Sequence, residues 1–136
     1  MNPLEFRFYY FTPSYDQTVS FYRDILRFEI YRTWDRPDGD RGTIFRSPNG
    51  AGLIELEAGD QRPSIHGGFY VEVDDLDHWY DRVREAGAPI RKELGDTSYG
   101  HRNFKTVEPS GIEVCFFQYL GSGKSPSITP SKGAAE

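Results

Sequence analysis

The stretch FYVEVDDLDHWYDRVREAGAPI, residues 69–90, decides the fold. Phe69, Val71 and Val73 alternate with Tyr70 and Glu72, which is the period of a β-strand with one buried face. The period then lengthens to three or four residues, as on one face of an amphipathic helix, at Leu76, Tyr80 and Val83. The closing AGAPI supplies a glycine suited to a left-handed helix end and a proline that prevents continuation. The stretch therefore predicts a strand, a helix and the start of a second strand.

The same pattern occurs 61 residues earlier in the chain. At this offset, Phe8-Tyr9 aligns with Phe69-Tyr70, and the turn SPNG at 47–50 aligns with EPSG at 108–111. In the earlier half, Ser14 followed by Gln17 predicts a capping box at the start of a helix. The agreement of strand, helix and turn at one offset indicates a duplicated β-α-β-β-β unit.

Each half carries four predicted strands. Alternation and turn signals place them at residues 6–11, 28–33, 43–47 and 52–57 in the first half, and at 68–73, 90–94, 102–106 and 112–118 in the second. The predicted fold is α+β, with two tandem modules whose mixed, curled sheets enclose a cleft. Module one covers about 4–58 and module two about 66–119, within one domain at 1–120. The Gly-, Ser- and Pro-rich residues 121–136 are expected to form a disordered tail.

The bulk composition excludes several classes of protein. The 136 residues carry a net charge of −5 with no Lys/Arg stripe, so we expect no nucleic acid partner. No apolar run is long enough to span a membrane, and the first residues lack a signal-peptide layout. The single cysteine, Cys115, allows no internal disulfide, so a cytoplasmic location is expected. Aromatic residues make up 15% of the chain, and some are expected to line a ligand pocket.

Three segments give the chain a family resemblance: SFYRDILRFEI at 20–30, residues 69–90, and YGHRNFKTVEPSGIEVCFFQ at 99–118. Together they resemble the vicinal oxygen chelate superfamily, which holds glyoxalase I, bleomycin-resistance proteins, fosfomycin-resistance enzymes and extradiol dioxygenases. The resemblance implies a paired β-α-β-β-β fold and a homodimer, but no single activity. One departure is Arg27, where the family usually has glycine after the helix. A non-glycine residue there avoids the left-handed conformation or accepts a cost of about 1 kcal/mol.

The resemblance also implies where a metal ion would bind, on the first and last strands of each unit. The matching positions are Arg7, Ile54, Gly68 and Cys115. An arginine remains protonated, glycine has no side chain and isoleucine is apolar, so this set predicts no metal and no cofactor. A displaced pair, His66 and Glu113, is the weak alternative.

Strand alternation predicts which side chains face the cleft. The ligand-binding set expected from it, with His101 added from the loop before a strand, is Arg7, Tyr9, Ile54, Leu56, Gly68, Tyr70, Glu72, His101, Glu113, Cys115 and Phe117. Arg7, Glu72 and Glu113 are the charged members, and they either pair with one another or orient a ligand.

These observations favour a metal-free small-molecule binding protein similar to bleomycin-resistance proteins. It would sequester a planar or cationic compound in an aromatic cleft. One alternative is a metal-dependent enzyme of the glyoxalase or dioxygenase type that uses His66 and Glu113. Another is a metal-free isomerase or cyclase in which Glu72 or Glu113 acts as the catalytic general base. If the chain is an enzyme, the resemblance implies a lyase, an isomerase or a dioxygenase.

Overall fold

The computed structural model describes residues 5–121, and its first half contains one helical segment and four strands. These elements are β1 (Arg7–Thr12), α1 (Tyr15–Ser20), η1 (Phe21–Ile25), β2 (Glu29–Asp35), β3 (Arg41–Arg46) and β4 (Leu53–Ala58). The second half repeats the order with β5 (Gly68–Glu72), α2 (Leu76–Glu85), β6 (Ile90–Asp96), β7 (His101–Val107) and β8 (Glu113–Tyr119). Each predicted strand is present, with ends that differ by at most two residues. The predicted tail lies outside the described residues, apart from its first residue.

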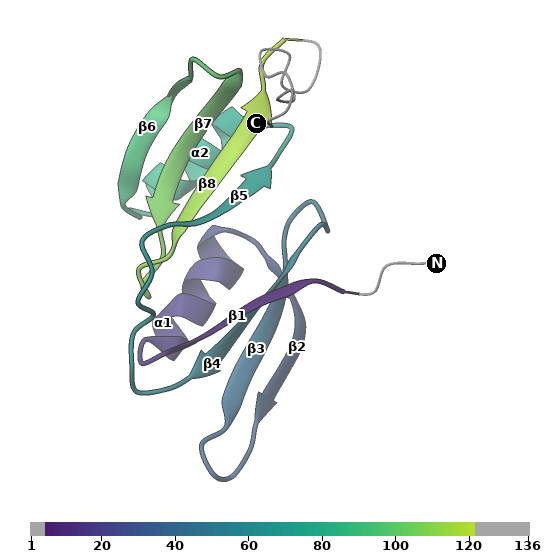
Figure 1. Cartoon of the computed structure of the whole chain (residues 1–136), viewed down its shortest axis with the longest axis vertical. Coiled ribbons are helices and arrows are strands. Elements are labelled where there is room, and N and C mark those ends of the chain that lie inside the picture. Colours follow the sequence, from purple (N-terminus) through teal and green to yellow (C-terminus); the bar gives the residue numbers. More distant parts are fainter. Residues whose placement is uncertain (1–4, 122–136) are drawn as a thin grey trace, which may run out of the picture.

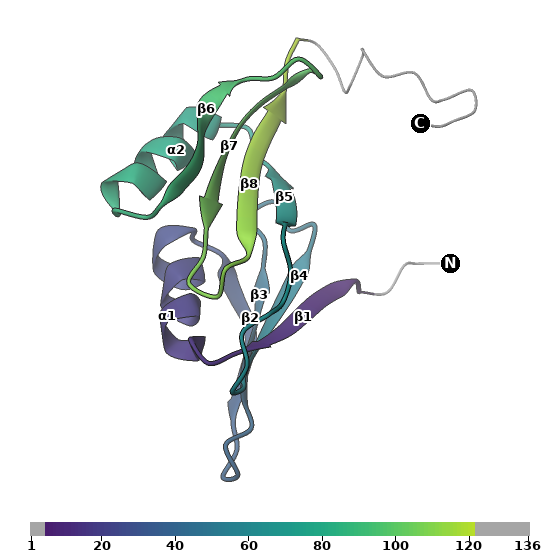
Figure 2. The same ribbon diagram turned by 60° about the vertical axis from the view of Figure 1, so that its left-hand side comes forward.

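The strands form two four-stranded mixed sheets, one in each module. Their orders are β1-β4-β3-β2 and β5-β8-β7-β6, so the first and last strands of each module are neighbours. These neighbours run parallel, and the other pairs run antiparallel. The predicted fold class is therefore confirmed. Both helices lie on one side of the sheets, and the opposite face of each sheet is left open (Figures 1 and 2).

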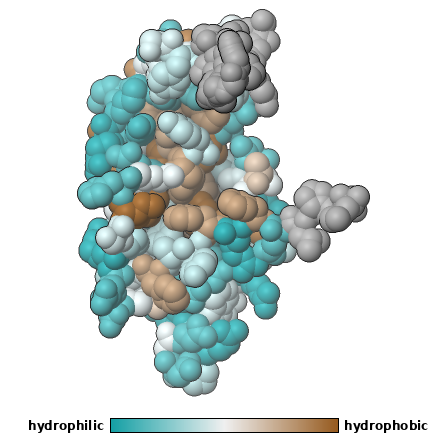
Figure 3. Space-filling view, viewed as in Figure 1, coloured by the Kyte–Doolittle hydropathy of each residue, from teal (hydrophilic) through white to brown (hydrophobic). Residues whose placement is uncertain are grey.

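The open face is the one presented to the viewer in Figure 3, where hydrophobic side chains gather along the middle of the molecule. Within residues 5–121, no helix is long and apolar enough to cross a membrane.

The first helix differs from its prediction at both ends. The Ser14 side chain caps no backbone N–H, so the predicted capping box is wrong. Its backbone, at φ −98° and ψ 40°, lies outside the extended region from which an N-cap side chain reaches the helix. At the other end, five residues form a π-helical turn, and Arg27 adopts the left-handed conformation at φ 59°. Arg27 thus accepts the backbone cost, whereas Gly87 occupies the same conformation after α2 at φ 76° without it.

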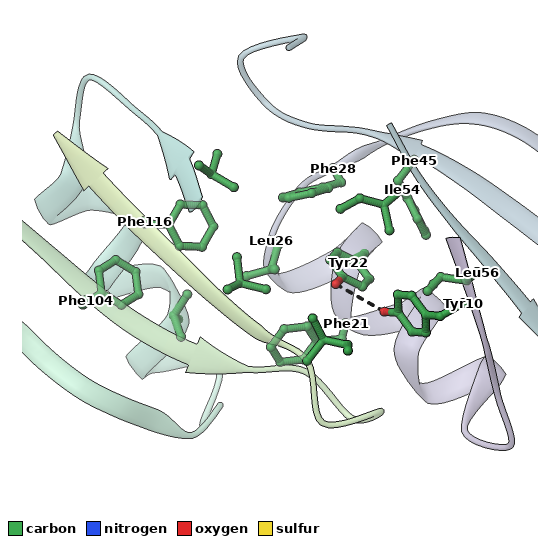
Figure 4. Close-up of a cluster of buried hydrophobic side chains, with 14 of the residues drawn as sticks. Tyr10, Phe21, Tyr22, Leu26, Phe28, Phe45, Ile54, Leu56, Phe104 and Phe116 are labelled. Carbon is green, nitrogen blue, oxygen red and sulfur yellow. Dashed lines mark hydrogen bonds between the residues drawn. The ribbon is translucent and has the colours of Figure 1, made fainter. Parts of the chain in front are cut away.

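The core lies on the helix side of the two sheets and is shared by both modules (Figure 4). Tyr22 and Leu26 from the first module, and Phe104 and Phe116 from the second, are fully buried. Side chains of this size each stabilise the fold by about 1.5–3 kcal/mol through burial of apolar surface. Trp79 of α2 stacks on Phe116 with ring centroids 5.2 Å apart, which attaches the second helix to its sheet.

A buried carboxyl group joins the modules. Glu108, in the turn before β8, accepts hydrogen bonds from the hydroxyl groups of Tyr10 and Tyr22 in the other module. It also accepts from the backbone N–H groups of Ser110 and Ile112, the second at 3.2 Å. Burial raises the pKa of Glu108, although these hydrogen bonds oppose the shift. Because this network crosses the junction, the two modules are held as one body.

Candidate functional site

The open sheet faces carry large aromatic side chains that are well exposed. Tyr9 and Tyr70 are 62% and 57% exposed, and they occupy corresponding places on β1 and β5. Phe11 and Tyr99 are 46% and 41% exposed. Large aromatic groups are usually buried in the core, so their exposure on one side of the sheets makes this face the candidate binding surface.

The predicted orientation of the first module's last strand is wrong. Ile54 and Leu56 are 5% and 0% exposed and pack in the core on the helix side (Figure 4). Tyr9 pairs instead with Glu55, whose side chain therefore shares the open face. The cause is one extra residue in the first module between the turn glycine, Gly50, and the last strand. Arg7 pairs with Leu53, whereas its counterpart Gly68 pairs with Glu113. The offset between the two modules is therefore 61 residues at the first strand and 60 at the last. A shift of one residue turns every side chain to the other face.

The second module has the predicted orientation. Its three register pairs on the open face are Gly68 with Glu113, Tyr70 with Cys115, and Glu72 with Phe117. Whether these residues bind a ligand remains a prediction.

A charged cluster occupies the open face of the first module. The Arg7 guanidinium donates to Glu55 at 2.6 Å and also contacts Glu5. Glu57, two residues further along β4, shares a hydrogen bond with Glu55. This bond, together with burial and the Glu55 charge, raises the pKa of Glu57 to about 7. Burial opposes ionisation of Glu55, but the hydrogen bonds from Glu57 and Arg7 outweigh it and lower its pKa.

Neither glutamate of this pair was singled out from the sequence. The signal that could have found them is the alternation in LIELE, residues 53–57, which places two carboxylates on one face. Together with the correct pairing of β1 and β4, this alternation would have placed Glu55 and Glu57 on the same face as Arg7.

An aromatic cluster occupies the open face of the second module. The His101 ring, at the start of β7, stacks on Phe117 with centroids 4.4 Å apart and an interplanar angle of 22°. Tyr70, Tyr99 and Tyr119 contact the same imidazole edge to face, at 6.2, 5.1 and 5.0 Å. The predicted placement of His101 with Tyr70 and Phe117 therefore matches the structure, and the two other tyrosines extend the cluster.

Glu113 and Cys115 border a small hollow of about 150 Å³ beside Gly68. Glu113 forms an ion pair with Arg91 at 2.9 Å. Cys115 is 4% exposed, and burial raises the pKa of its thiol to about 11, so the thiol is protonated at neutral pH. A protonated thiol is a poor metal ligand and a poor nucleophile.

Two larger hollows lie where the modules meet. One, of about 260 Å³, is lined mainly by apolar groups, including Phe6, Phe8, Leu53 and Phe69. The other, of about 670 Å³, is bordered by Glu72, Trp79 and Tyr119 among others. The Asn49 side chain, which borders both hollows, joins the two modules by donating a hydrogen bond to the Glu72 carbonyl oxygen at 3.0 Å.

The residues at the family's metal positions do not fit a metal ion. After correction of the register these positions are Arg7, Glu55, Gly68 and Cys115, and the guanidinium of the first already neutralises the carboxylate of the second. A Cβ at Gly68 would lie 1.6 Å from the Glu113 carbonyl oxygen, so β5 excludes a ligating side chain there. Among the described residues, no three His, Cys, Asp or Glu side chains are grouped to hold a metal.

The displaced pair fits no better. His66 is exposed in the segment before β5, and Glu113 is already paired with Arg91.

A family model described as the Glyoxalase/Bleomycin resistance protein/Dioxygenase superfamily matches residues 6–116. A solved glyoxalase/bleomycin resistance protein/dioxygenase from Nocardioides is 19% identical, with a TM-score of 0.71 over 95% of this chain and 91% of its own. Lactoylglutathione lyase from Agrobacterium tumefaciens is 18% identical, with a TM-score of 0.63 over 87% and 94% of the two chains. The fosfomycin resistance protein FosX from Listeria monocytogenes is 14% identical, with a TM-score of 0.63 over 90% and 96%. No curated protein matches the sequence. At these identities the likeness concerns the fold alone.

Proposed function

Because the chain belongs to the glyoxalase/bleomycin resistance protein/dioxygenase superfamily, we propose that it is a metal-free protein that binds and sequesters a planar or cationic small molecule. Members of this superfamily differ in chemistry, so the proposal rests on the side chains of the open faces rather than on the fold.

The observation that carries the proposal is the ion pair between Arg7 and Glu55, 2.6 Å apart on neighbouring strands. It puts a fixed protein cation at the place where related sites would require a metal. A divalent ion bound at Glu55 would have to displace the guanidinium and would then lie close to that positive charge.

The rest of the open surface suits a flat guest. The exposed rings of Tyr9 and Tyr70 offer stacking faces, and offset or edge-to-face contacts stabilise aromatic pairs by about 0.5–1.5 kcal/mol each. Glu72, on the same face as Tyr70, supplies a carboxylate for a cationic group. The net charge of −5 adds a general attraction for cations.

A homodimer is part of this proposal. The open faces of one chain carry exposed aromatic groups over both modules, and a second copy placed against them would turn two open surfaces into an enclosed cleft. A cytoplasmic location also remains part of it, since the single cysteine suits a reducing compartment.

Titration of the purified protein with planar cations and aromatic acids, followed by tryptophan fluorescence of Trp34 and Trp79, tests the proposal. We expect saturable binding that is unchanged by EDTA. Loss of binding in EDTA, restored by zinc or manganese, would reject the metal-free site. Failure of every compound to bind would reject sequestration itself.

A second candidate function, metal-free proton transfer, is favoured by Glu57. A general base works best with a pKa near the working pH, and the pKa of Glu57 is about 7. Glu57 is thus a candidate base in addition to Glu72 and Glu113, the two that the sequence suggested. Under this alternative, turnover of a bound compound would be lost in Glu57→Gln and kept in Glu113→Gln. Equal rates in the two variants would remove Glu57 from the reaction.

A further inference from the structure

Two buried polar atoms in the second module have no hydrogen-bond partner in the part of the chain that the structure describes. They are Nδ1 of His101 and Oδ1 of Asn103. Both residues lie on β7 two positions apart, so their side chains project from the same face. Asn103 pairs with Phe117, which places both residues on the open face within the aromatic cluster. Buried polar atoms are rarely left unsatisfied, and such atoms at a surface of this kind call for a ligand.

The chemistry of the pair defines what it would accept. The Asn103 side chain is fully buried, and its Nδ2 already donates to the Tyr99 hydroxyl at 3.3 Å. Its oxygen can only accept a hydrogen bond, whereas the neutral imidazole of His101 can donate or accept at Nδ1. The complementary group is therefore a hydrogen-bond donor, which an N–H on the edge of a planar ring supplies, and a second polar atom beside it would suit the histidine.

Room for such a group exists next to Asn103. Gly95 of β6 pairs with Asn103, so a side chain at Gly95 would point to the same face. No heavy atom lies within 4 Å of the position that its Cβ would take. The aromatic rings of Tyr70 and Tyr99, each partly exposed, border the open side. Tyr99, in the turn between β6 and β7, accepts a hydrogen bond from the Asn103 amide, so a ligand has to displace the Tyr99 side chain to reach the buried oxygen.

We propose that the open face of the second module is a subsite for a flat aromatic ring that carries an N–H on its edge, with Asn103 as the acceptor and Gly95 as the entry. This inference rests on the proposed function and narrows its ligand to lactam-like and amino-substituted rings. The charged cluster of the first module plays no part in it.

Matched pairs of probes test the subsite: acridone against N-methylacridone, and carbostyril against N-methylcarbostyril. Methylation removes the N–H and keeps the ring. We expect the N–H form to bind the wild-type protein about tenfold more tightly, the usual cost of one missing hydrogen bond at a buried acceptor. In Asn103→Leu, which keeps a similar volume, the two forms should bind equally. Gly95→Val should weaken both forms alike because it fills the entry.

His78→Gln, an exposed histidine on α2, is the control and should keep the tenfold ratio. Equal binding of the methylated and unmethylated probes to the wild type would overturn the inference, as would an unchanged ratio in Asn103→Leu or failure of all four probes to bind. Binding of other planar cations would still leave the proposed function standing in each case. Because Asn103→Leu removes an unsatisfied buried oxygen, we expect it to fold with a melting temperature close to that of the wild type.

Discussion

The open faces of the two modules are built on the same strand order but carry opposite chemistry. In the first module the face is ionic, with Arg7 paired to Glu5 and Glu55, and with Glu57, whose pKa is raised to about 7, beside Glu55. In the second, the centre is a stack of rings around His101. Gly68 stands where the first module has Arg7, and Cys115 where it has Glu55. The duplicated scaffold therefore presents a charged cluster on the open face of one module and stacked rings on the open face of the other.

The largest expected effect on stability comes from removing the carboxyl group that joins the two modules. Glu108→Ala would leave two backbone N–H groups buried without an acceptor, and would leave the hydroxyl groups of Tyr10 and Tyr22 with only their mutual contact at 3.4 Å. We expect the free energy of unfolding to fall by about 4 kcal/mol, since each unsatisfied buried group costs about 1–3 kcal/mol. Urea unfolding measures this loss. Glu108→Gln keeps an acceptor oxygen and should lose clearly less. A loss under 1 kcal/mol (roughly the effect of an average substitution) in the alanine variant would show that the modules are not joined there.

The next-largest expected effect on stability tests why Gly68 stands where the first module has Arg7. In Gly68→Ala the new Cβ would collide with the backbone oxygen of Glu113, so β5 and β8 must separate locally. We expect a loss of about 3 kcal/mol, in the range of severe steric substitutions. Gly95→Ala, a strand glycine with open space around its Cβ, is the matched control and should change stability by less than about 0.5 kcal/mol. If Gly68→Ala and Gly95→Ala lowered the melting temperature by the same amount, this account of Gly68 would be contradicted.

A smaller effect is expected from the ion pair of the first module. Arg7 is one-third exposed at its side chain, so water screens the interaction and Arg7→Met should cost only about 1 kcal/mol. A double-mutant cycle with Glu55→Gln isolates the pairwise part, which should be stabilising. A coupling energy of zero would show that the pair is merely a surface contact.

The smallest effect is a pH dependence that arises chiefly from Glu57 in the first module. Folding raises the pKa of Glu57 from the ordinary 4.5 to about 7, so the folded chain holds this proton more tightly than the unfolded chain. Stability from this group is therefore complete below pH 4.5 and declines as the pH rises to about 7. Glu108, whose pKa is also raised by burial, contributes with the same sign. Glu57→Gln should flatten the fall in melting temperature over this interval, while Glu72→Gln should not. If the melting temperature of the two variants changed with pH in the same way, Glu57 would be excluded as the titrating group.

The fold could be predicted from the sequence because local patterns and the repeat agree at each level. Alternation marked each strand, and the turn glycines Gly50 and Gly111 helped to align the two halves. The orientation of β4 was predicted wrongly because the 61-residue offset does not hold beyond the extra residue in the glycine-rich turn at 50–52. The alternation in LIELE, residues 53–57, indicates the orientation that the structure has. The π-helical turn before Arg27 also escaped prediction, since the apolar spacing of Tyr22 and Leu26 suits an ordinary helix equally well.

The site was predictable only in the module whose register was correct. Tyr70 and Phe117 could be placed together because the alternation in β5 and β8 is unbroken, whereas His101 was added from the loop before a strand. The contact between Arg7 and Glu55 depends on the pairing of two strands far apart in the sequence, and one residue of slippage concealed it. Asn103 gave no signal at all, because its missing partner is a property of three-dimensional packing.

The most direct test of the central claim is the metal content of the protein, measured by mass spectrometry of the elements after purification without chelators. With Arg7 paired to Glu55 and no side chain possible at Gly68, the account predicts zinc, iron, manganese and nickel far below one ion per chain. A stoichiometric metal ion that is lost in Glu55→Gln would contradict it.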